Sequence, residues 1–503
     1  MTRMSGPKPA VAFLMICIAT PTMLSAQTVT TLFSFSGSNG NHPQASLVQG
    51  IDGNLYGTTE AGGTDFGACN GCGTLFTITP AGALTTLYNF CSKFDCYDGA
   101  YPDAPLLLTE SGSFYGTAYG GGSVKGNCNN YGCGTAFRID PAGALSTIHD
   151  FCSEHCADGA GPQTALVQAP DGNFYGTTGH GGGSSDAGVV FTMTPAGALT
   201  TLYSFCSQPN CPDGELPLAP LVQGADGNFY GTTFSGGNMS NQYPCNTVGC
   251  GTIFEITPSG TLTTIYKFCS EPNCTDGIGP SGGLVQGSDG AFYGMTSYGG
   301  RPGGNGTVFR ITAQGKFRIL HSFNGGNGAR PVANLIQATD GDLYGTTEGG
   351  GGKNGGTLFK ITPSGTYSVL YNFCAQINCA DGEVPAGGLY QSTNGIIYGT
   401  TFLGGSSSGC GLGCGTVFSL SLGLSPFVTF VRAAARVGQT GGILGQGFTG
   451  TTSVMVNGIP ATFRVVSDTF IQATVPQGAT TGYITVTTPS SVLKSNVPFH
   501  VIQ

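Results

Sequence analysis

The sequence predicts an all-β protein, a seven-bladed β-propeller closed by its N-terminal strand and followed by a small β-sandwich. Three observations lead to this fold. A four-segment unit recurs seven times, the fourth segment of the last unit is found at the start of the chain, and a different strand pattern follows. We expect a signal peptide at 1–26, the propeller at 27–424 and the sandwich at 425–503.

The repeat has a landmark, a Tyr-Gly pair in the second segment of each unit. All four segments alternate apolar with polar residues and are rich in β-branched and aromatic residues, which is typical of strands about five to seven residues long. Asp-Gly pairs and Thr-Pro-x-Gly stretches supply the tight turns of a meander. The landmark tyrosines are Tyr56, Tyr115, Tyr175, Tyr230, Tyr293, Tyr344 and Tyr398.

The distribution of the fourth segment predicts that the repeat closes into a ring. The first three segments occur in every unit, but the chain leaves the pattern after the third segment of the last one. The missing segment is found at 29–35, before the first unit. We therefore expect the N-terminal strand to complete the seventh blade, which leaves no exposed sheet edge.

The two faces of the predicted disc differ in character. The loops between strands one and two, and between three and four, are tight and of nearly constant length, whereas the other two sets are long, glycine-rich and variable. Binding residues usually lie on variable loops held by a rigid scaffold, so we expect any binding site on this second face. The candidate binding residues there are Asp98, Asp158, Asp213, Asp276, Asp381 and His180.

The repeated aspartates and glutamines each have two interpretations. The aspartates could offer carboxylates to Ca²⁺ or to sugar hydroxyls, but Asp-Gly is also ordinary turn chemistry, and we favour turns. The glutamine that ends most first strands could contact a ligand in the central channel, but we favour hydrogen bonds to backbone groups around it. His149 and His321 take the place of a fourth-strand tyrosine, and we expect them to pack.

Nineteen cysteines are present, and all but Cys17 fall into close pairs within the variable loops. Loops that lack one member lack both, which indicates disulfides. Clusters of this spacing can also bind metal, but no histidine recurs beside them, so we predict disulfides and no metal. Pairing between neighbouring loops stays open. The pairs are Cys69/Cys72, Cys91/Cys96, Cys128/Cys133, Cys152/Cys156, Cys206/Cys211, Cys245/Cys250, Cys269/Cys274, Cys374/Cys379 and Cys410/Cys414.

Composition and charge limit the classes of partner and activity that we expect. The 503 residues carry a net charge of −9 without a basic cluster, which argues against nucleic acid and anionic membranes as partners. Arg3, Lys8 and the short apolar run that follows read as a secretory signal, so we expect export and no stable membrane insertion after cleavage. No residue breaks the repeat as a recognisable acid–base pair, and we assign neither a catalytic residue nor a cofactor.

Two resemblances add to this interpretation. Gly442–Phe448, Val456–Gly458, Ser467–Thr469 and Gly482–Val486 make 425–503 similar to an IPT/TIG immunoglobulin-like domain. The repeated Asp-Gly-Asn-Phe-Tyr-Gly-Thr-Thr core resembles the GloVer tandem repeat of exported bacterial proteins, a family without an assigned activity.

These observations favour a secreted or cell-envelope binding and scaffold protein whose variable face takes a polysaccharide or a surface protein. Two alternatives remain open. One is a polysaccharide-acting hydrolase or lyase, which would need a carboxylate pair or a histidine that breaks the repeat at the channel mouth. The other is a structural component of a surface layer.

Overall fold

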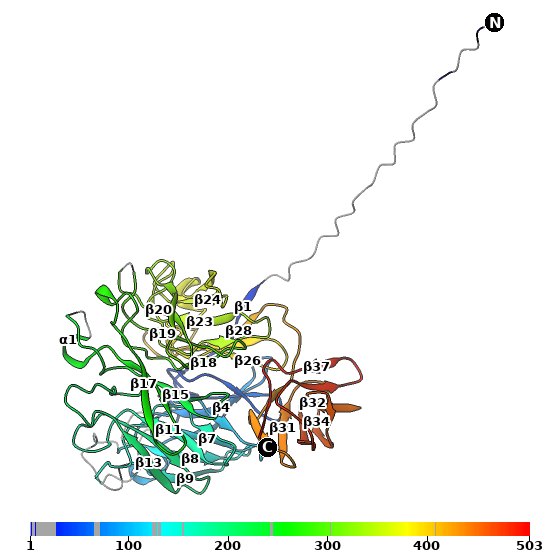
Figure 1. Cartoon of the computed structure of the whole chain (residues 1–503), viewed down its shortest axis with the longest axis horizontal. Coiled ribbons are helices and arrows are strands. Elements are labelled where there is room, and N and C mark those ends of the chain that lie inside the picture. The colour runs from blue at the N-terminus through cyan, green and yellow to red at the C-terminus, as the bar shows by residue number, and fades with distance from the viewer. Residues whose placement is uncertain are drawn as a thin grey trace.

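A computed structural model describes Thr2, Gly6 and residues 27–64, 71–122, 128, 132–152, 155–241, 245–301, 303–407 and 409–502. Apart from Thr2 and Gly6, the predicted signal peptide lies outside the described residues, as does Cys69. In the described part of the chain, seven four-stranded antiparallel sheets follow one another around a ring, as the colour sequence in Figure 1 shows. The predicted seven-bladed propeller is confirmed.

In the first six sheets the strands lie side by side in chain order, from first to fourth. The first strands are β2 (Val48–Gln49), β6 (Leu107–Leu108), β10 (Val167–Gln168), β14 (Val222–Gln223), β18 (Val285–Gln286), β22 (Ile336–Gln337) and β26 (Tyr390–Gln391). The second strands are β3 (Leu55–Thr59), β7 (Phe114–Ala118), β11 (Phe174–Thr178), β15 (Phe229–Thr233), β19 (Phe292–Thr296), β23 (Leu343–Thr347) and β27 (Ile397–Thr401).

The third strands are β4 (Thr74–Ile78), β8 (Thr135–Ile139), β12 (Val189–Met193), β16 (Thr252–Ile256), β20 (Thr307–Ile311), β24 (Thr357–Ile361) and β28 (Thr416–Ser421). The fourth strands are β5 (Leu84–Asn89), β9 (Leu145–Asp150), β13 (Leu199–Ser204), β17 (Leu262–Lys267), β21 (Phe317–Ser322), β25 (Tyr367–Asn372) and, in the seventh blade, β1 (Thr28–Ser34).

The first strands are shorter than expected, since each contributes only two residues to its sheet instead of five to seven. The two paired residues are those next to the tight turn, and the residues before them do not pair with the second strand. The residues before each pair continue as extended chain in which buried and half-buried side chains alternate. The predicted strand segment is therefore present, but most of it lies outside the hydrogen-bonded ladder.

Strand β1 closes the ring as predicted. It pairs antiparallel with β28, from Thr28 opposite Ser421 to Ser34 opposite Thr416. The next residue, Phe35, is fully buried and meets the Phe76 ring of the first blade edge to face, with centroids 5.2 Å apart. The two ends of the repeat are therefore joined both within a sheet and across the boundary between blades.

The glycine of the Tyr-Gly landmark makes room for an aromatic ring. In the fourth blade Gly231 lies opposite Phe254, and a Cβ on Gly231 would be only 2.5 Å from that ring. The same glycine–phenylalanine pairing recurs in every blade. The glycine is needed at this position because the phenylalanine ring lies over its backbone.

The landmark tyrosine connects its own turn to the next blade. Tyr230 donates its hydroxyl to Asp226 of the Asp-Gly turn at 2.6 Å, while its ring packs on Phe292 of the following blade. Burial and the nearby carboxylate hold the pKa of Tyr230 well above its usual range, so the phenol stays protonated and donates. One residue thus fixes a turn and an interface between blades.

The repeated glutamines form hydrogen bonds between neighbouring blades. Gln337 donates to the carbonyl of Gly341 in its own turn and accepts from the backbone amide of Ser288 in the preceding blade. At the point of closure, buried Gln49 accepts from the amide of Thr393 in the seventh blade at 2.9 Å. These contacts agree with the favoured interpretation, in which the glutamines bond backbone groups.

The C-terminal segment forms two four-stranded sheets that share one core. Their strand orders are β29-β31-β35-β34 and β33-β32-β36-β37, and a parallel pair, β30 with β38, lies at one end. The strands are β29 (Thr429–Phe430), β30 (Ala434–Arg436), β31 (Thr440–Leu444), β32 (Ser453–Val456), β33 (Ile459–Pro460), β34 (Phe463–Ser467), β35 (Phe470–Thr474), β36 (Ile484–Thr487), β37 (Val492–Lys494) and β38 (His500–Ile502).

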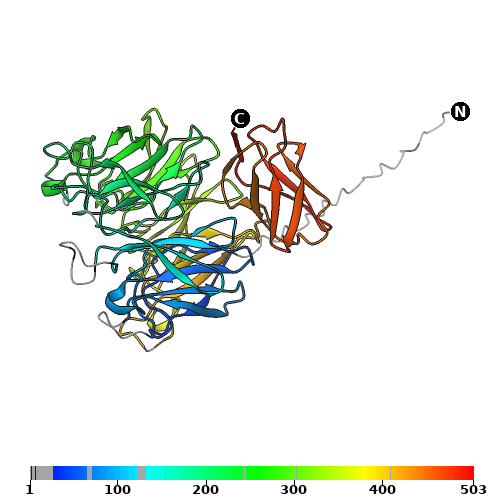
Figure 2. The same ribbon diagram turned by 90° about the horizontal axis from the view of Figure 1, so that it is seen from below.

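This C-terminal unit docks on the tight-turn face of the propeller (Figure 2). Thr469 donates its hydroxyl to the carbonyl of Ile51 at 2.7 Å, and Arg432 forms an ion pair with Glu110 at 2.8 Å. Leu108, which stands where other blades have glutamine, belongs to an apolar cluster with Leu444 of the C-terminal unit. The departure from the repeat at Leu108 therefore coincides with this interface.

Helices are few in the described residues. They are one α-turn, α1 (Cys245–Val248), and the 3₁₀ segments η1 (Phe94–Cys96), η2 (Pro272–Cys274) and η3 (Ile377–Cys379). None of the helices within the described ranges has the length and apolar character needed to cross a bilayer.

Candidate functional site

The variable face is built from two sets of loops that pair with each other. The loop after each fourth strand meets the loop after the second strand of the next blade through a short antiparallel bridge, such as Ala160 with His180. Both backbone hydrogen bonds of that bridge are short, 2.9 and 3.0 Å. These bridges recur around the ring, so the variable loops are fixed to one another and not only to their own strands.

The predicted disulfides within single loops are confirmed wherever both partners are described. The bonds are Cys91–Cys96, Cys128–Cys133, Cys152–Cys156, Cys206–Cys211, Cys245–Cys250, Cys269–Cys274, Cys374–Cys379 and Cys410–Cys414. The pair Cys69/Cys72 is not described because Cys69 lies outside the described residues. Pairing between neighbouring loops, the alternative left open, is not observed among these bonds.

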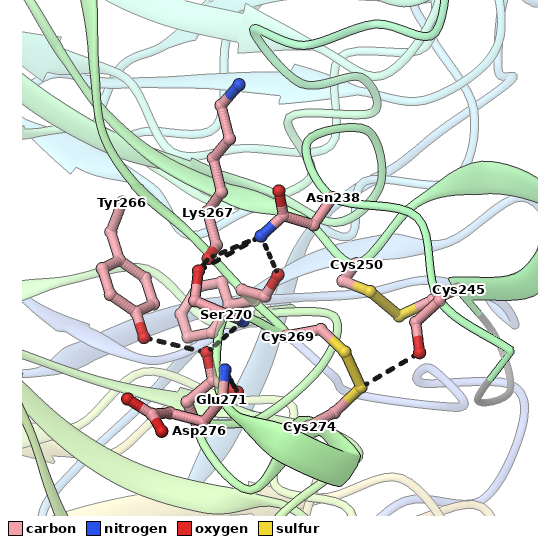
Figure 3. The surroundings of a disulfide bond; sticks show 12 residues. Asn238, Cys245, Cys250, Tyr266, Lys267, Cys269, Ser270, Glu271, Cys274 and Asp276 are labelled. Atoms are coloured by element: carbon pink, nitrogen blue, oxygen red, sulfur yellow. Dashed lines mark hydrogen bonds between the residues drawn. A yellow bond between two sulfur atoms is a disulfide. The ribbon is translucent and has the colours of Figure 1, made fainter.

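The candidate aspartates hold their own loops in place. Asp276 is buried and accepts hydrogen bonds from the Tyr266 hydroxyl at 2.8 Å and from the Ser270 amide at 2.9 Å (Figure 3). Asp98 and Asp381 are equally buried and make the same set of contacts. These carboxylates are directed into the loop, which supports the turn interpretation over ligand binding.

The remaining two aspartates follow the same plan with small changes. Asp213 accepts from the Tyr203 hydroxyl and from the amide of Cys206. Burial and Asp213 together raise the pKa of Tyr203 to about 12, which keeps this donor protonated. Asp158 instead meets Nε2 of His149 at 3.1 Å, because a histidine replaces the fourth-strand tyrosine in that blade. His149 also packs edge to face on Phe151, and His321 stacks on Tyr367.

His180, the last candidate, lies in a pocket of about 490 Å³ between the second and third blades. Its Nδ1 is 3.4 Å from Asp186, whose other oxygen accepts the amide of Gly181 at 2.7 Å. His155, Tyr101 and Tyr119 also line the pocket, together with cysteines of two disulfides. The site thus combines two phenols, two imidazoles and one carboxylate. The loops of Tyr119 and His155 each contain a disulfide, whereas the loop of His180 and Asp186 has no cysteine.

Sequence reasoning missed most of this pocket. Tyr119 directly follows the second strand, where the other blades have Glu60, Gly179, Phe234, Ser297, Glu348 and Phe402, so only its departure from a variable position could have marked it. Asp186 lies in a loop without cysteines, and the sequence shows that these cysteines are missing. The folding of two loops toward each other was not visible, because the repeat does not show which loops form a concave surface.

A carboxylate pair that was not recognised from the sequence also lies on this face. Asp103 departs from the repeat, but Glu60 has a counterpart in Glu348. Glu60 directly follows β3, and Asp103 precedes β6 by a few residues. Gln44 donates to Glu60 at 2.9 Å, while the buried Oδ1 of Asp103 has no hydrogen-bond partner among the described residues. Burial, reinforced by the Glu60 charge, raises the pKa of Asp103 well above its ordinary value, and burial raises that of Glu60.

This raised pKa makes stability depend on pH. Folding favours the protonated form of Asp103, so its contribution is fully present below about pH 4 and is lost as pH rises through the folded-state pKa. We expect Asp103→Asn to be more stable than the wild type at pH 7 and equal to it near pH 3. Urea unfolding at both pH values measures the difference, with exposed Asp95→Asn as the control. Equal stability at pH 7 would contradict the burial argument.

Comparison with known protein families identifies the repeat of this chain. The model of the Gloeobacter/Verrucomicrobia repeat matches residues 20–243 and 208–418. No match was found among curated proteins.

Solved structures similar in fold include a luciferin-regenerating enzyme, with 14% identity and a TM-score of 0.39 over 65% of this chain and 93% of that one. A putative gluconolactonase has 13% identity and a TM-score of 0.37 over 80% and 94%. The PQQ-bound aldose sugar dehydrogenase of Streptomyces coelicolor has 11% identity and a TM-score of 0.39 over 78% and 98%. By its repeat, which spans most of its length, the chain belongs to the Gloeobacter/Verrucomicrobia repeat family.

Proposed function

We propose that the protein is an exported, non-catalytic binding protein that takes a segment of polysaccharide in the pocket between the second and third blades. The composition of the pocket carries this proposal. The C–H faces of a pyranose ring are apolar and pack on aromatic side chains such as Tyr101 and Tyr119. Sugar hydroxyls need donors and acceptors around that platform, and His155, His180 and Asp186 supply both.

The construction of the site supports binding by a preformed surface. Its volume of about 490 Å³ falls in the range of ordinary small-molecule sites, about 300–1,000 Å³. The Cys128–Cys133 and Cys152–Cys156 disulfides close small rings in two of the loops that line it, and the bridge between Ala160 and His180 joins the second of these loops to the third. Loops ordered before binding lose less entropy when the ligand arrives, which favours affinity.

Export and an extracellular or cell-envelope location belong to the same proposal. Disulfides form and persist in oxidising compartments, and eight are present in the described residues. The two-sheet C-terminal unit, with Gly445 and Asp468 in its turns, fits an IPT/TIG immunoglobulin-like module that serves as spacer or second contact.

A glycan array probed with residues 27–503 tests the proposal. We expect selective binding, and we expect Tyr119→Ala to weaken the affinity for the best glycan at least tenfold because it removes the aromatic platform. Phe234→Ala is the matched control. Phe234 has the same position in the fourth blade, and its ring covers Gly279 as that of Tyr119 covers Gly161. Absence of any glycan signal, or equal losses in both variants, would contradict the proposal.

A second function, cleavage of polysaccharide by a hydrolase or lyase, is favoured by the Glu60 and Asp103 pair. The raised pKa of Asp103 suits a general acid, and Glu60 is the second carboxylate that a base would need. A depolymerisation assay on the glycans that bind would separate the two functions. Product formation that Asp103→Asn abolishes, without loss of binding, would replace the binding-only proposal with the enzymatic one.

A further inference from the structure

Two disulfides of the fourth blade lie side by side on the variable face (Figure 3). Cys245–Cys250 belongs to the loop after the second strand, and Cys269–Cys274 to the loop after the fourth. The four sulfur atoms all lie within 4.8 Å of one another. Cys245, Cys250 and Cys274 are fully buried, and Cys269 is half-buried. Four sulfurs from two loops therefore lie together in one small, largely buried volume.

We propose that reduction of these two disulfides converts the cluster into a tetrathiolate site for a soft divalent metal ion such as Zn²⁺. A tetrahedral zinc site has Zn–S bonds of about 2.3 Å, which sets sulfur–sulfur distances of about 3.8 Å. The sulfurs are already gathered to within 4.8 Å of one another, so only small side-chain rotations are needed. Thiolates are the ligands that select zinc and similar soft ions over Ca²⁺ and Mg²⁺.

Backbone contacts hold the cysteines independently of the disulfides. The carbonyl of Cys250 accepts the amide of Gly279 at 2.9 Å, and the carbonyl of Cys274 accepts those of Gly277 and Gly300 at 3.0 and 3.1 Å. Asn238 joins the two loops, because its amide nitrogen donates to the Phe268 carbonyl at 3.1 Å. We therefore expect the loops to keep their places when the sulfur–sulfur bonds are opened.

The surroundings also suit a charged thiolate centre. The Ser240 hydroxyl lies 3.4 Å from the sulfur of Cys274 and would donate to that sulfur in the thiolate form. Hydrogen bonds from outside the ligand shell orient ligands and raise metal affinity. The second blade repeats the arrangement, since Cys128, Cys133, Cys152 and Cys156 also lie within 4.8 Å of one another. Where the facing loop has no cysteine pair, the groups within this distance are Cys206, Cys211 and Glu215, and Cys374, Cys379 and Glu383.

The conversion is balanced in electrons and protons. Two equivalents of a dithiol reductant give two electrons and two protons to each disulfide, and the reductant leaves as its own disulfide. The four thiols that result lose four protons when the metal binds, which gives a centre of charge −2. Oxidation releases the ion, so the cluster would hold metal only in the reduced state.

Cobalt binding tests this inference. The folded protein is reduced anaerobically with a dithiol, which is then removed by gel filtration, and Co²⁺ is titrated in. We expect the absorption bands of tetrahedral cobalt thiolate in the reduced protein and none in the oxidised protein. Cys269→Ser/Cys274→Ser should bind one equivalent fewer. The matched control Cys374→Ser/Cys379→Ser removes an isolated pair, which has only Glu383 nearby, and should leave the stoichiometry unchanged.

Three outcomes would overturn the proposal. They are disulfides that the reductant does not open in the folded protein, a reduced protein without the tetrahedral cobalt spectrum, and equal losses of cobalt in the two double variants. Thermal melting of each reduced sample, with and without metal, shows whether the chain is folded. Metal should raise the melting temperature of the reduced wild type. Cobalt binding by an unfolded chain would count against a site built by the fold.

Discussion

Deletion of residues 27–36 is expected to abolish cooperative folding of the propeller or to lower its melting temperature by more than about 10 °C. The deletion removes β1, which leaves β28 as an exposed strand edge in the seventh blade. It also removes Phe35, which packs between Phe33 and Phe76. Loss of a buried phenylalanine alone costs about 3–5 kcal/mol, a large part of the stability of an average domain.

Circular dichroism melts of the full and shortened chains measure this effect. Thr30→Ala is the control, because Thr30 is exposed on β1 and its loss should change the melting temperature little. A synthetic peptide of residues 27–36, added to the shortened chain, should restore part of the stability by occupying the empty edge. A melting temperature unaffected by the deletion would mean that closure by β1 does not stabilise the ring.

Phe254→Ala is expected to cost about 3–5 kcal/mol of unfolding free energy. The Phe254 ring is fully buried, lies over the backbone of Gly231 and meets Phe205 edge to face at 5.3 Å. Its loss leaves a cavity between two blades that the sheets cannot collapse to fill, since strands on both sides are fixed by their ladders.

Chemical denaturation of Phe254→Ala against the wild type measures this cost. The exposed Phe94→Ala is the control, because 82% of the Phe94 surface is open to solvent and its removal leaves no cavity. A second variant, Gly231→Ala, should also destabilise the fold, because the new methyl group would meet the ring of Phe254 at 2.5 Å. A small effect of Phe254→Ala would contradict the assignment of this ring to a rigid contact between blades.

Blade number, ring closure and the disulfides described here could be predicted because each depends on residues that recur, or are missing, at regular positions of the repeat. The number of blades follows from counting the seven copies of the motif. The displaced strand at 29–35 indicates how the two ends of the repeat meet. The short first strands could not be foreseen, because alternation continues through residues that lie outside the ladder. Leu108 shows the opposite case, since its departure from the repeat was visible but the C-terminal unit that covers it was not.

The candidate site was predicted less well, for a physical reason. A residue that recurs in every blade, such as Asp276 and its counterparts, is more readily explained by a contact that every blade needs. A ligand needs one special place, and such a place is made by single residues like Tyr119, His155 and Asp186. They come together only when loops of two blades meet. His180 was selected because it is rare, not because its partners were known.

The pairing of β1 with β28 also orders events during synthesis. Thr28 is among the first blade residues to leave the ribosome, and its partner Ser421 is among the last. Blades one to six can form from consecutive strands as they emerge, but β1 must wait for almost the whole repeat. A chain interrupted before Ser421 keeps an unpaired β1. The ring therefore closes only after the final repeat has been synthesised, so an incomplete chain cannot form the closed propeller.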